Sequence, residues 1–214
     1  MAASEVATTA TDLVLAGARE AYALCRPPGH HAYADMAGGF CFLNNSAIAA
    51  QRLRGKHERV AILDVDVHHG NGTQGIFFER DDVLTVSIHA DPNFYYPYFW
   101  GHAHETGAGK SQGFSMNLPL PLGSPDAPWL EAGDKALSRI REFAPTALVV
   151  ALGLDASESD PLQGLKVTGA GFHAMAKKIA GLGLPTVLVQ EGGYLSDDLG
   201  RNLVQFLSGF EAGR

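Results

Sequence analysis

Residues 62–73 read I-L-D-V-D-V-H-H-G-N-G-T, and the rest of the chain can be interpreted from this stretch outward. Its apolar start predicts a buried strand over residues 60–67, and the G-N-G that follows predicts a turn. Side chains two positions apart on an extended strand project to the same side, so Asp64, Asp66 and His68 are expected to point together. The stretch therefore predicts metal-competent side chains at the end of a buried strand.

Apolar strand-like runs alternate with helical stretches along the rest of the chain. Continuous apolar runs, typical of strands covered on both faces, occupy residues 83–88, 147–154 and 185–190, and shorter strands are expected at 21–25 and 114–120. Helices are expected at 44–53, 73–78, 127–143, 168–182 and 197–207. This alternation predicts a three-layer α/β/α fold with a mainly parallel sheet, in which ligand sites gather at the carboxyl ends of the strands.

The first residues carry a weaker signal. Residues 11–18 predict a short helix, whereas residues 1–10 are small and polar and are expected to be disordered. The chain has no internal repeat, low-complexity tract or interdomain linker. Residues 1–214 are therefore interpreted as a single domain.

The composition excludes several functional classes. Of the 214 residues, 46% are hydrophobic and 18% charged, and the formal net charge of −7 argues against a nucleic-acid partner held through phosphate contacts. No signal peptide and no apolar run of about 18 residues is found, which predicts a cytoplasmic protein without a membrane partner. Cys25 and Cys41 lie in or beside apolar runs and are expected to be buried thiols rather than a disulfide.

Residues at other strand ends supply partners for the opening stretch. Asp66, His68 and Asp155 make a plausible metal triad, because three protein ligands leave coordination positions open for water and substrate. Zinc bound there would lower the pKa of its water to about 7. His30 and His31, presented by a Pro-Pro-Gly turn, are the candidates to take the water proton and to orient or protonate a leaving amine.

Three more residues are of the right type to complete such a site. Asp64 and Asn71 are suited to fix the tautomers of the histidines through their far ring nitrogens. Tyr194 follows a Gly-Gly pair and is suited to donate its hydroxyl to a developing oxyanion. Together these residues predict metal-assisted amide hydrolysis.

Five motifs, in this order, resemble those of the histone deacetylase superfamily: R-P-P-G-H-H-A at 26–32, G-G-F-C-F-L-N-N at 38–45, D-V-D-V-H-H-G-N-G-T at 64–73, L-G-L-D at 152–155 and E-G-G-Y at 191–194. The variant looks most similar to bacterial acetylpolyamine amidohydrolases and class II-type deacetylases. The resemblance covers residues 21–207. It implies an arginase/deacetylase-like fold and the removal of acetyl or other acyl groups from amines such as acetylpolyamines or acetyl-lysine.

The resemblance also implies roles for individual residues. One zinc ion per chain would be bound by Asp66, His68 and Asp155, with iron(II) as the alternative native metal. The other catalytic roles belong to the tandem histidines, the two side chains behind them and the transition-state tyrosine: His30, His31, Asp64, Asn71 and Tyr194.

A substrate tunnel and a second ion are implied in the same way. The carbonyl of Gly39 would accept a hydrogen bond from the scissile amide, and Phe40 and Tyr96 would form the aromatic walls of the tunnel. A structural monovalent cation such as K⁺ would be held by the side chains of Asp64 and Ser87 and by the carbonyls of Asp66, His68 and Ile88.

One feature departs from the family pattern. Only 25 residues precede Arg26, whereas catalytic domains of the family usually carry a longer segment with early strands and two loops at the tunnel rim. The resemblance therefore implies a domain that lacks the N-terminal strands. The strand at 21–25 would then be a sheet edge open to pairing, and a homo-oligomer is among the states to consider.

Two alternative functions remain open. An arginase-like dimetal hydrolase would need more carboxylates, but Asp155 is followed by Ala156 and Ser157. Asp160 is expected to cap a loop rather than to bind a second metal. The other alternative is a deacetylase-like module that binds acylated amines without hydrolysing them, and only the short N-terminal segment favours it.

Overall fold

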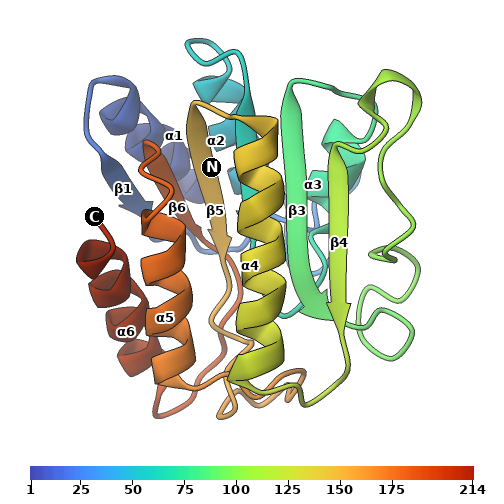
Figure 1. Ribbon diagram of the computed structural model, residues 1–214, viewed down its shortest axis with the longest axis vertical. Coiled ribbons are helices and arrows are strands. Elements are labelled where there is room, and N and C mark those ends of the chain that lie inside the picture. The colour runs from blue at the N-terminus through green and yellow to red at the C-terminus, as the bar shows by residue number, and fades with distance from the viewer.

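A six-stranded parallel sheet forms the centre of the computed structural model, which describes residues 1–214 (Figure 1). The strands are β1 (Glu20–Ala23), β2 (Val60–Asp64), β3 (Val83–Ala90), β4 (Ser115–Leu120), β5 (Ala147–Leu152) and β6 (Thr186–Gln190). They lie in the order β1-β6-β5-β2-β3-β4, and every neighbouring pair is parallel. The predicted mainly parallel sheet is confirmed, and β1, as expected, lies at one of its edges.

Helices cover both faces of the sheet, because most parallel strands here are joined by crossover helices. In Figure 1, α4 (Asp126–Phe143), α5 (Gly169–Ala180) and α6 (Leu199–Ala212) lie in front of the sheet, and α1 (Ala2–Leu15), α2 (Asn45–Leu53) and α3 (Asn71–Phe77) lie behind it. A short 3₁₀ helix, η1 (Gly109–Ser111), lies in the connection between β3 and β4. The arrangement confirms the predicted three layers.

The four central strands, β6, β5, β2 and β3, contribute side chains to two hydrophobic cores. On β2, Ala61 and Leu63 pack in the core beneath α4, α5 and α6, whereas Val60 and Ile62 pack in the core beneath α1 and α2. Full burial of a large aliphatic side chain stabilises the fold by about 1.5–3 kcal/mol. Coverage of both faces therefore explains why the strand sequences are continuously apolar rather than alternating.

The N-terminal segment differs from expectation. Residues 1–10 were expected to be disordered and a helix was expected at 11–18, but one helix, α1, spans Ala2–Leu15. Ala3, Ala7, Ala10 and Val14 recur at the spacing of one helix face and are buried against the second core. Small alanines thus carry an amphipathic period that is easily overlooked when small residues are grouped with polar ones.

Strand β2 also ends earlier than predicted, at Asp64 rather than at residue 67. There, Oδ1 of Asp64 accepts a hydrogen bond from the backbone amide of Asp66 at 3.1 Å, which turns the chain away from the sheet. Asp64, Asp66 and His68 therefore do not line one face of a strand. Strands β1 and β5 likewise end two residues before their expected ends at 25 and 154.

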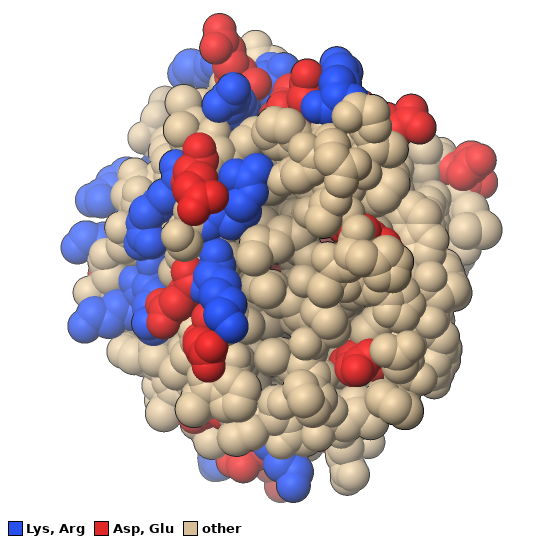
Figure 2. Space-filling model, turned by 45° about the vertical axis from the view of Figure 1, so that its right-hand side comes forward, with Lys and Arg blue, Asp and Glu red and all other residues tan.

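The surface shows charges of both signs side by side. On the face drawn in Figure 2, Lys and Arg gather along one side, where Asp and Glu are interleaved with them, and most of the remaining surface is uncharged. Pairs such as Lys178 with Asp134, at 2.6 Å, show this local neutralisation. None of the helices has the length and apolarity needed to cross a membrane.

Candidate active site

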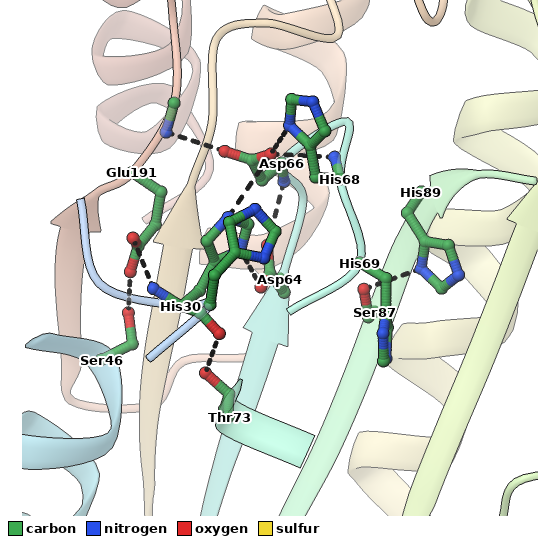
Figure 3. A network of polar contacts seen from close by, with 12 residues as sticks. His30, Ser46, Asp64, Asp66, His68, His69, Thr73, Ser87, His89 and Glu191 are labelled. Carbon is green, nitrogen blue, oxygen red and sulfur yellow. Dashed lines mark hydrogen bonds and ion pairs between the residues drawn. The ribbon is translucent and has the colours of Figure 1, made fainter. Parts of the chain in front are cut away.

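Buried polar side chains from four strand ends meet in one cluster (Figure 3). The segment after β1 delivers His30, the end of β2 delivers Asp64, and the segment after β5 delivers Asp155. Glu191 directly follows β6. The strand order places β5 between β2 and β6, which explains how residues from distant parts of the chain meet at the carboxyl edge.

Asp66, His68 and Asp155 form the core of this cluster. One ligand-type atom from each lies within 4.8 Å of the others, and all three residues are buried. Nδ1 of His68 lies 3.0 Å from Oδ1 of Asp66 and 3.2 Å from Oδ2 of Asp155. Asp66 is further held by the amide of Gly192, which donates to its Oδ2 at 2.7 Å.

The electrostatics of the cluster call for a positive charge. Burial disfavours protonation of His68, but the carboxylates of Asp155 and Asp66 outweigh it and raise the pKa of His68 to about 10. Burial and the neighbouring Asp66 raise the pKa of Asp155 to about 6. Two buried carboxylates so close together are stable only if a proton or a cation compensates them.

The residues present fit a single divalent metal ion. The buried Oδ2 of Asp155 has no hydrogen-bond partner, although Nδ1 of His68 lies 3.2 Å from it. A Cβ at Gly192 would lie 2.1 Å from that oxygen, and one at Gly153 would lie 2.3 Å from Oδ2 of Asp66. Glycines thus leave room for the carboxylates to converge. Carboxylate oxygens and an imidazole nitrogen are donors that zinc accepts.

The tandem histidines lie beside this cluster and have different partners. Nδ1 of His30 is 2.9 Å from Oδ2 of Asp64, and Nδ1 of His31 is 2.6 Å from Oδ1 of Asn71. The two rings are adjacent, with centroids 4.0 Å apart. Both pairings join the residues that the sequence suggested as histidine partners.

Neighbouring charges and burial separate the pKa values of the two histidines. Burial lowers the pKa of His30, but Asp66 and Asp64 outweigh it and raise that pKa well above its usual value. Burial and the charge of His30 lower the pKa of His31 well below its usual value. The pair therefore combines a His30 whose surroundings favour the protonated form with a His31 whose surroundings favour the neutral form.

A pocket of about 420 Å³ opens beside the two histidines and beside Asp66, His68 and Asp155, which together are called the metal-type cluster below. Its lining is mostly aromatic and comprises His31, Gly39, Phe40, His68, Tyr95, Tyr96, Tyr98, Leu162 and Tyr194. All three residues expected to contact substrate, Gly39, Phe40 and Tyr96, are among them. The sequence did not identify Tyr95 as a pocket residue. In the structure its ring stacks on His68, with centroids 5.1 Å apart.

One wall of the pocket is pressed against His31. Gly39 and Phe40 both have positive φ, at +52° and +65°. A Cβ at Gly39 would lie 2.2 Å from Cδ2 of His31, so only glycine fits there. Phe40 is 73% exposed and lines the pocket, so it lies at the pocket mouth.

Tyr194 also lines the pocket. Its amide donates to Oδ2 of Asp160 at 3.1 Å, while Oδ1 of Asp160 accepts from the amide of Leu162 at 2.9 Å. Asp160 therefore caps loops, as expected, and does not join the metal-type cluster. Burial, with Asp155 and Asp66 nearby, raises the pKa of Tyr194, so its hydroxyl remains a proton donor at neutral pH.

The residues expected to hold a monovalent cation lie at and just after the end of β2 and within the neighbouring strand β3. Asp64 and Ser87 are register partners on β2 and β3, and Ile88 follows Ser87 on the same strand. Asp64 and Ser87 are both buried, and Ser87 Oγ lies 2.8 Å from Nδ1 of His89. Asp64 thus has contacts on two sides, with His30 and with β3.

Sequence reasoning did not anticipate a structural role for Glu191. Its carboxylate accepts hydrogen bonds from Gly29, His30 and Ser46, all in segments far from it in sequence. The available signal was an acidic residue placed between a buried strand and a Gly-Gly pair. Cys25 and Cys41 are free and buried, as predicted.

The chain is similar over most of its length to known proteins of one family. Residues 1–210 match the histone deacetylase domain. The chain is 53% identical to an acetylpolyamine amidohydrolase of Burkholderia pseudomallei, over 98% of this chain and 61% of the relative. It is 49% identical to the acetylpolyamine amidohydrolase of Mycoplana ramosa, over 92% of this chain and 58% of the relative.

Solved structures give the same result. A crystal structure of acetylpolyamine aminohydrolase from Burkholderia pseudomallei matches with a TM-score of 0.97 and 52% identity, covering 99% of this chain and 62% of that one. The HDA15 HD domain matches with a TM-score of 0.88 and 33% identity, covering 97% and 64%. The chain thus spans about three fifths of the length of these relatives. By its motifs, its fold and these similarities, the chain belongs to the histone deacetylase family.

Proposed function

We propose that this chain carries the active site of a metal-dependent amidohydrolase that removes acetyl groups from acetylated amines. The observation that supports this best is the buried Asp66–His68–Asp155 cluster beside two histidines of opposite protonation preference. An aromatic pocket opens directly onto both. The relatives named acetylpolyamine amidohydrolases favour a small acetylated amine as substrate, and acetyl-lysine is the second candidate.

Asp66, His68 and Asp155 would hold one zinc ion, with iron(II) as the alternative. Such an ion, when bound, polarises a carbonyl oxygen and lowers the pKa of a bound water to about 7. The unpartnered Oδ2 of Asp155 and the glycines at 153 and 192 support this assignment. A single cluster of this kind favours one metal over the two of an arginase-like enzyme.

The histidines divide the proton transfers between them. Nδ1–H of His31 donates to Asn71, which leaves the Nε2 lone pair of a neutral imidazole to accept a proton from water. His30 holds its proton through Asp64 and places a positive charge beside the reacting atoms. The protonated His30 can then donate a proton to the leaving amine as the carbon–nitrogen bond breaks.

The pocket walls position the acyl group. The Tyr194 hydroxyl is suited to donate to the oxyanion that develops on the acetyl carbonyl, and the Gly39 carbonyl to accept from the scissile amide N–H. Phe40 and Tyr96 would enclose the aliphatic chain of the amine, which an aromatic lining with few charges accommodates.

A monovalent cation, K⁺, is proposed as a second ion. Its ligands would be the side chains of Asp64 and Ser87 and the carbonyls of Asp66, His68 and Ile88. The register pairing of Asp64 with Ser87 supports this set. The cation would hold the segment that carries Asp66 and His68 against β3.

The function is tested by combining metal analysis with a substrate panel. Purified chain is expected to contain about one zinc per molecule and to release acetate from acetylpolyamines or acetyl-lysine, and His31→Ala should abolish release. His104→Ala is the matched control, because His104 is exposed and outside the pocket. Zinc without turnover would favour a binding module, and two metals with guanidino hydrolysis would favour the arginase-like alternative.

A further inference from the structure

Glu191 is a buried carboxylate beside the catalytic cluster that the proposed reaction does not use. It directly follows β6 and is 5% exposed. Its Oε2 accepts hydrogen bonds from the backbone amides of Gly29 at 2.6 Å and His30 at 3.0 Å. Its Oε1 accepts from the Ser46 hydroxyl at 2.6 Å. Figure 3 shows the carboxylate between Ser46 and the backbone of His30.

The turn that presents the histidines depends on this carboxylate for its backbone contacts. Residues 26–31 belong to no helix or strand, so no ladder of backbone hydrogen bonds holds them. The amides of Gly29 and His30 are buried donors, and a buried donor without a partner is strongly disfavoured. Both amides find their acceptor in the same oxygen, 162 and 161 residues away in sequence.

The other sides of the turn leave little freedom. A Cβ at Gly29 would lie 2.3 Å from the amide nitrogen of Asn45, so the backbone is already pressed against that segment. The carbonyl of His30 accepts from the amide of Thr73 at 3.1 Å. Glu191 on the amide side and Thr73 on the carbonyl side thus hold the backbone of His30 between them.

The contacts of the histidine rings cannot replace this support. Asp64 and Asn71 set the rotation of the two rings, but the position of each ring also depends on where its Cα lies. We propose that Glu191 is a positioning residue, whose carboxylate oxygen sets the location of His30 and His31 relative to the metal-type cluster through two backbone amides. This inference rests on the proposed deacetylase function.

The reach of the acceptor, rather than its charge, carries this role. Both amide contacts go to one oxygen, and the side-chain oxygen of glutamine can accept the same two bonds at the same reach. The glutamine NH₂ would face Ser46, whose hydroxyl can accept as well as donate. Aspartate keeps the charge but withdraws the carboxylate by one carbon–carbon bond, about 1.5 Å.

Glu191→Gln and Glu191→Asp therefore separate reach from charge. Glu191→Gln is expected to keep kcat within about threefold of the wild type, whereas Glu191→Asp should lower kcat by about 10- to 100-fold, because misplacing catalytic groups by about 1 Å has effects of this size. KM and zinc content should stay unchanged in both. Glu158→Asp, the same change at an exposed position, is the matched control.

Amide hydrogen exchange provides a readout that does not depend on activity. The amides of Gly29 and His30 should be protected in the wild type and in Glu191→Gln, and should exchange at least about tenfold faster in Glu191→Asp if their acceptor is withdrawn. Equal protection in both variants, or normal kcat in Glu191→Asp with a loss in Glu191→Gln, would overturn the inference. If the wild type released no acetate, the proposed function would fail, while the exchange pattern would still decide whether Glu191 holds the turn.

Discussion

Replacing Gly39 by alanine tests how tightly the pocket wall is pressed against His31, for which we propose a catalytic role. The new Cβ would lie 2.2 Å from Cδ2, 2.6 Å from Cγ and 2.9 Å from Cβ of His31. A simple swing of the ring cannot relieve contacts that include Cβ, and Asn71 holds Nδ1 at 2.6 Å. Either His31 or the wall must therefore move.

The expected loss of stability has two parts. Gly39 has φ +52°, and an L-residue in that region costs about 1–2 kcal/mol. Overpacking against His31 adds about 1–3 kcal/mol. The free energy of unfolding should therefore fall by about 2–5 kcal/mol in Gly39→Ala, and kcat should fall because His31 is displaced.

Gly109→Ala isolates the backbone part. Gly109 has nearly the same φ, +58°, but a Cβ there would meet nothing within 4 Å. It should therefore lose only about 1–2 kcal/mol and keep its activity. Urea unfolding of both variants, with acetate release measured in parallel, gives the steric part as the difference. Equal losses of stability, or normal turnover in Gly39→Ala, would refute the close packing of Gly39 on His31.

Three further predictions follow from the site. Tyr194→Phe should lower kcat by about 10²–10³-fold without changing thermal unfolding, because it removes one oxyanion donor; acetate release at wild-type rates would contradict the role. Asp155→Asn should lower the metal content well below one ion per chain, measured by elemental analysis against Glu158→Gln, and full occupancy would exclude Asp155 as a ligand. Burial raises the pKa of Glu191 to about 7 from 4.5, so the folded state binds this proton more tightly than the unfolded state does. The stability of the wild type relative to Glu191→Gln should therefore fall as pH rises from about 4.5 to 7 and level off above it, and a difference independent of pH in urea titrations would contradict this.

The secondary structure was largely predictable, and its errors have local causes. Continuous apolar runs identified the strands because both faces of this sheet are covered. Helix α1 was missed at residues 1–10 because its buried face is built of alanines. Helix α6 continues to Ala212, beyond the expected end at 207, because Gly209 and Phe210 continue its buried face.

The end of strand β2 was placed too late in the sequence, because a side-chain hydrogen bond rather than the hydrophobic pattern ends the strand. The valines at 65 and 67 are compatible with a longer strand, but the Asp64 side chain accepts a hydrogen bond from the amide of Asp66 and turns the chain. Because of this turn, the two aspartates have different partners. The Asp64 side chain contacts His30, whereas the Asp66 side chain lies with His68 and Asp155. A single extended strand would have kept all three side chains together.

By itself, the sequence determined the alternation of strands and helices, the chemical groups at the strand ends and the motifs that mark the family. Those properties are encoded locally, in hydrophobic period and residue type. Only the tertiary structure decided that Asp155 meets Asp66 and that Glu191 meets the turn of His30, because these contacts depend on the packing of β5 between β2 and β6. The electrostatic division between His30 and His31 likewise required the assembled site, since the carboxylates of Asp66 and Asp64 raise the pKa of His30 against the effect of burial, whereas burial and the charge of His30 lower the pKa of His31.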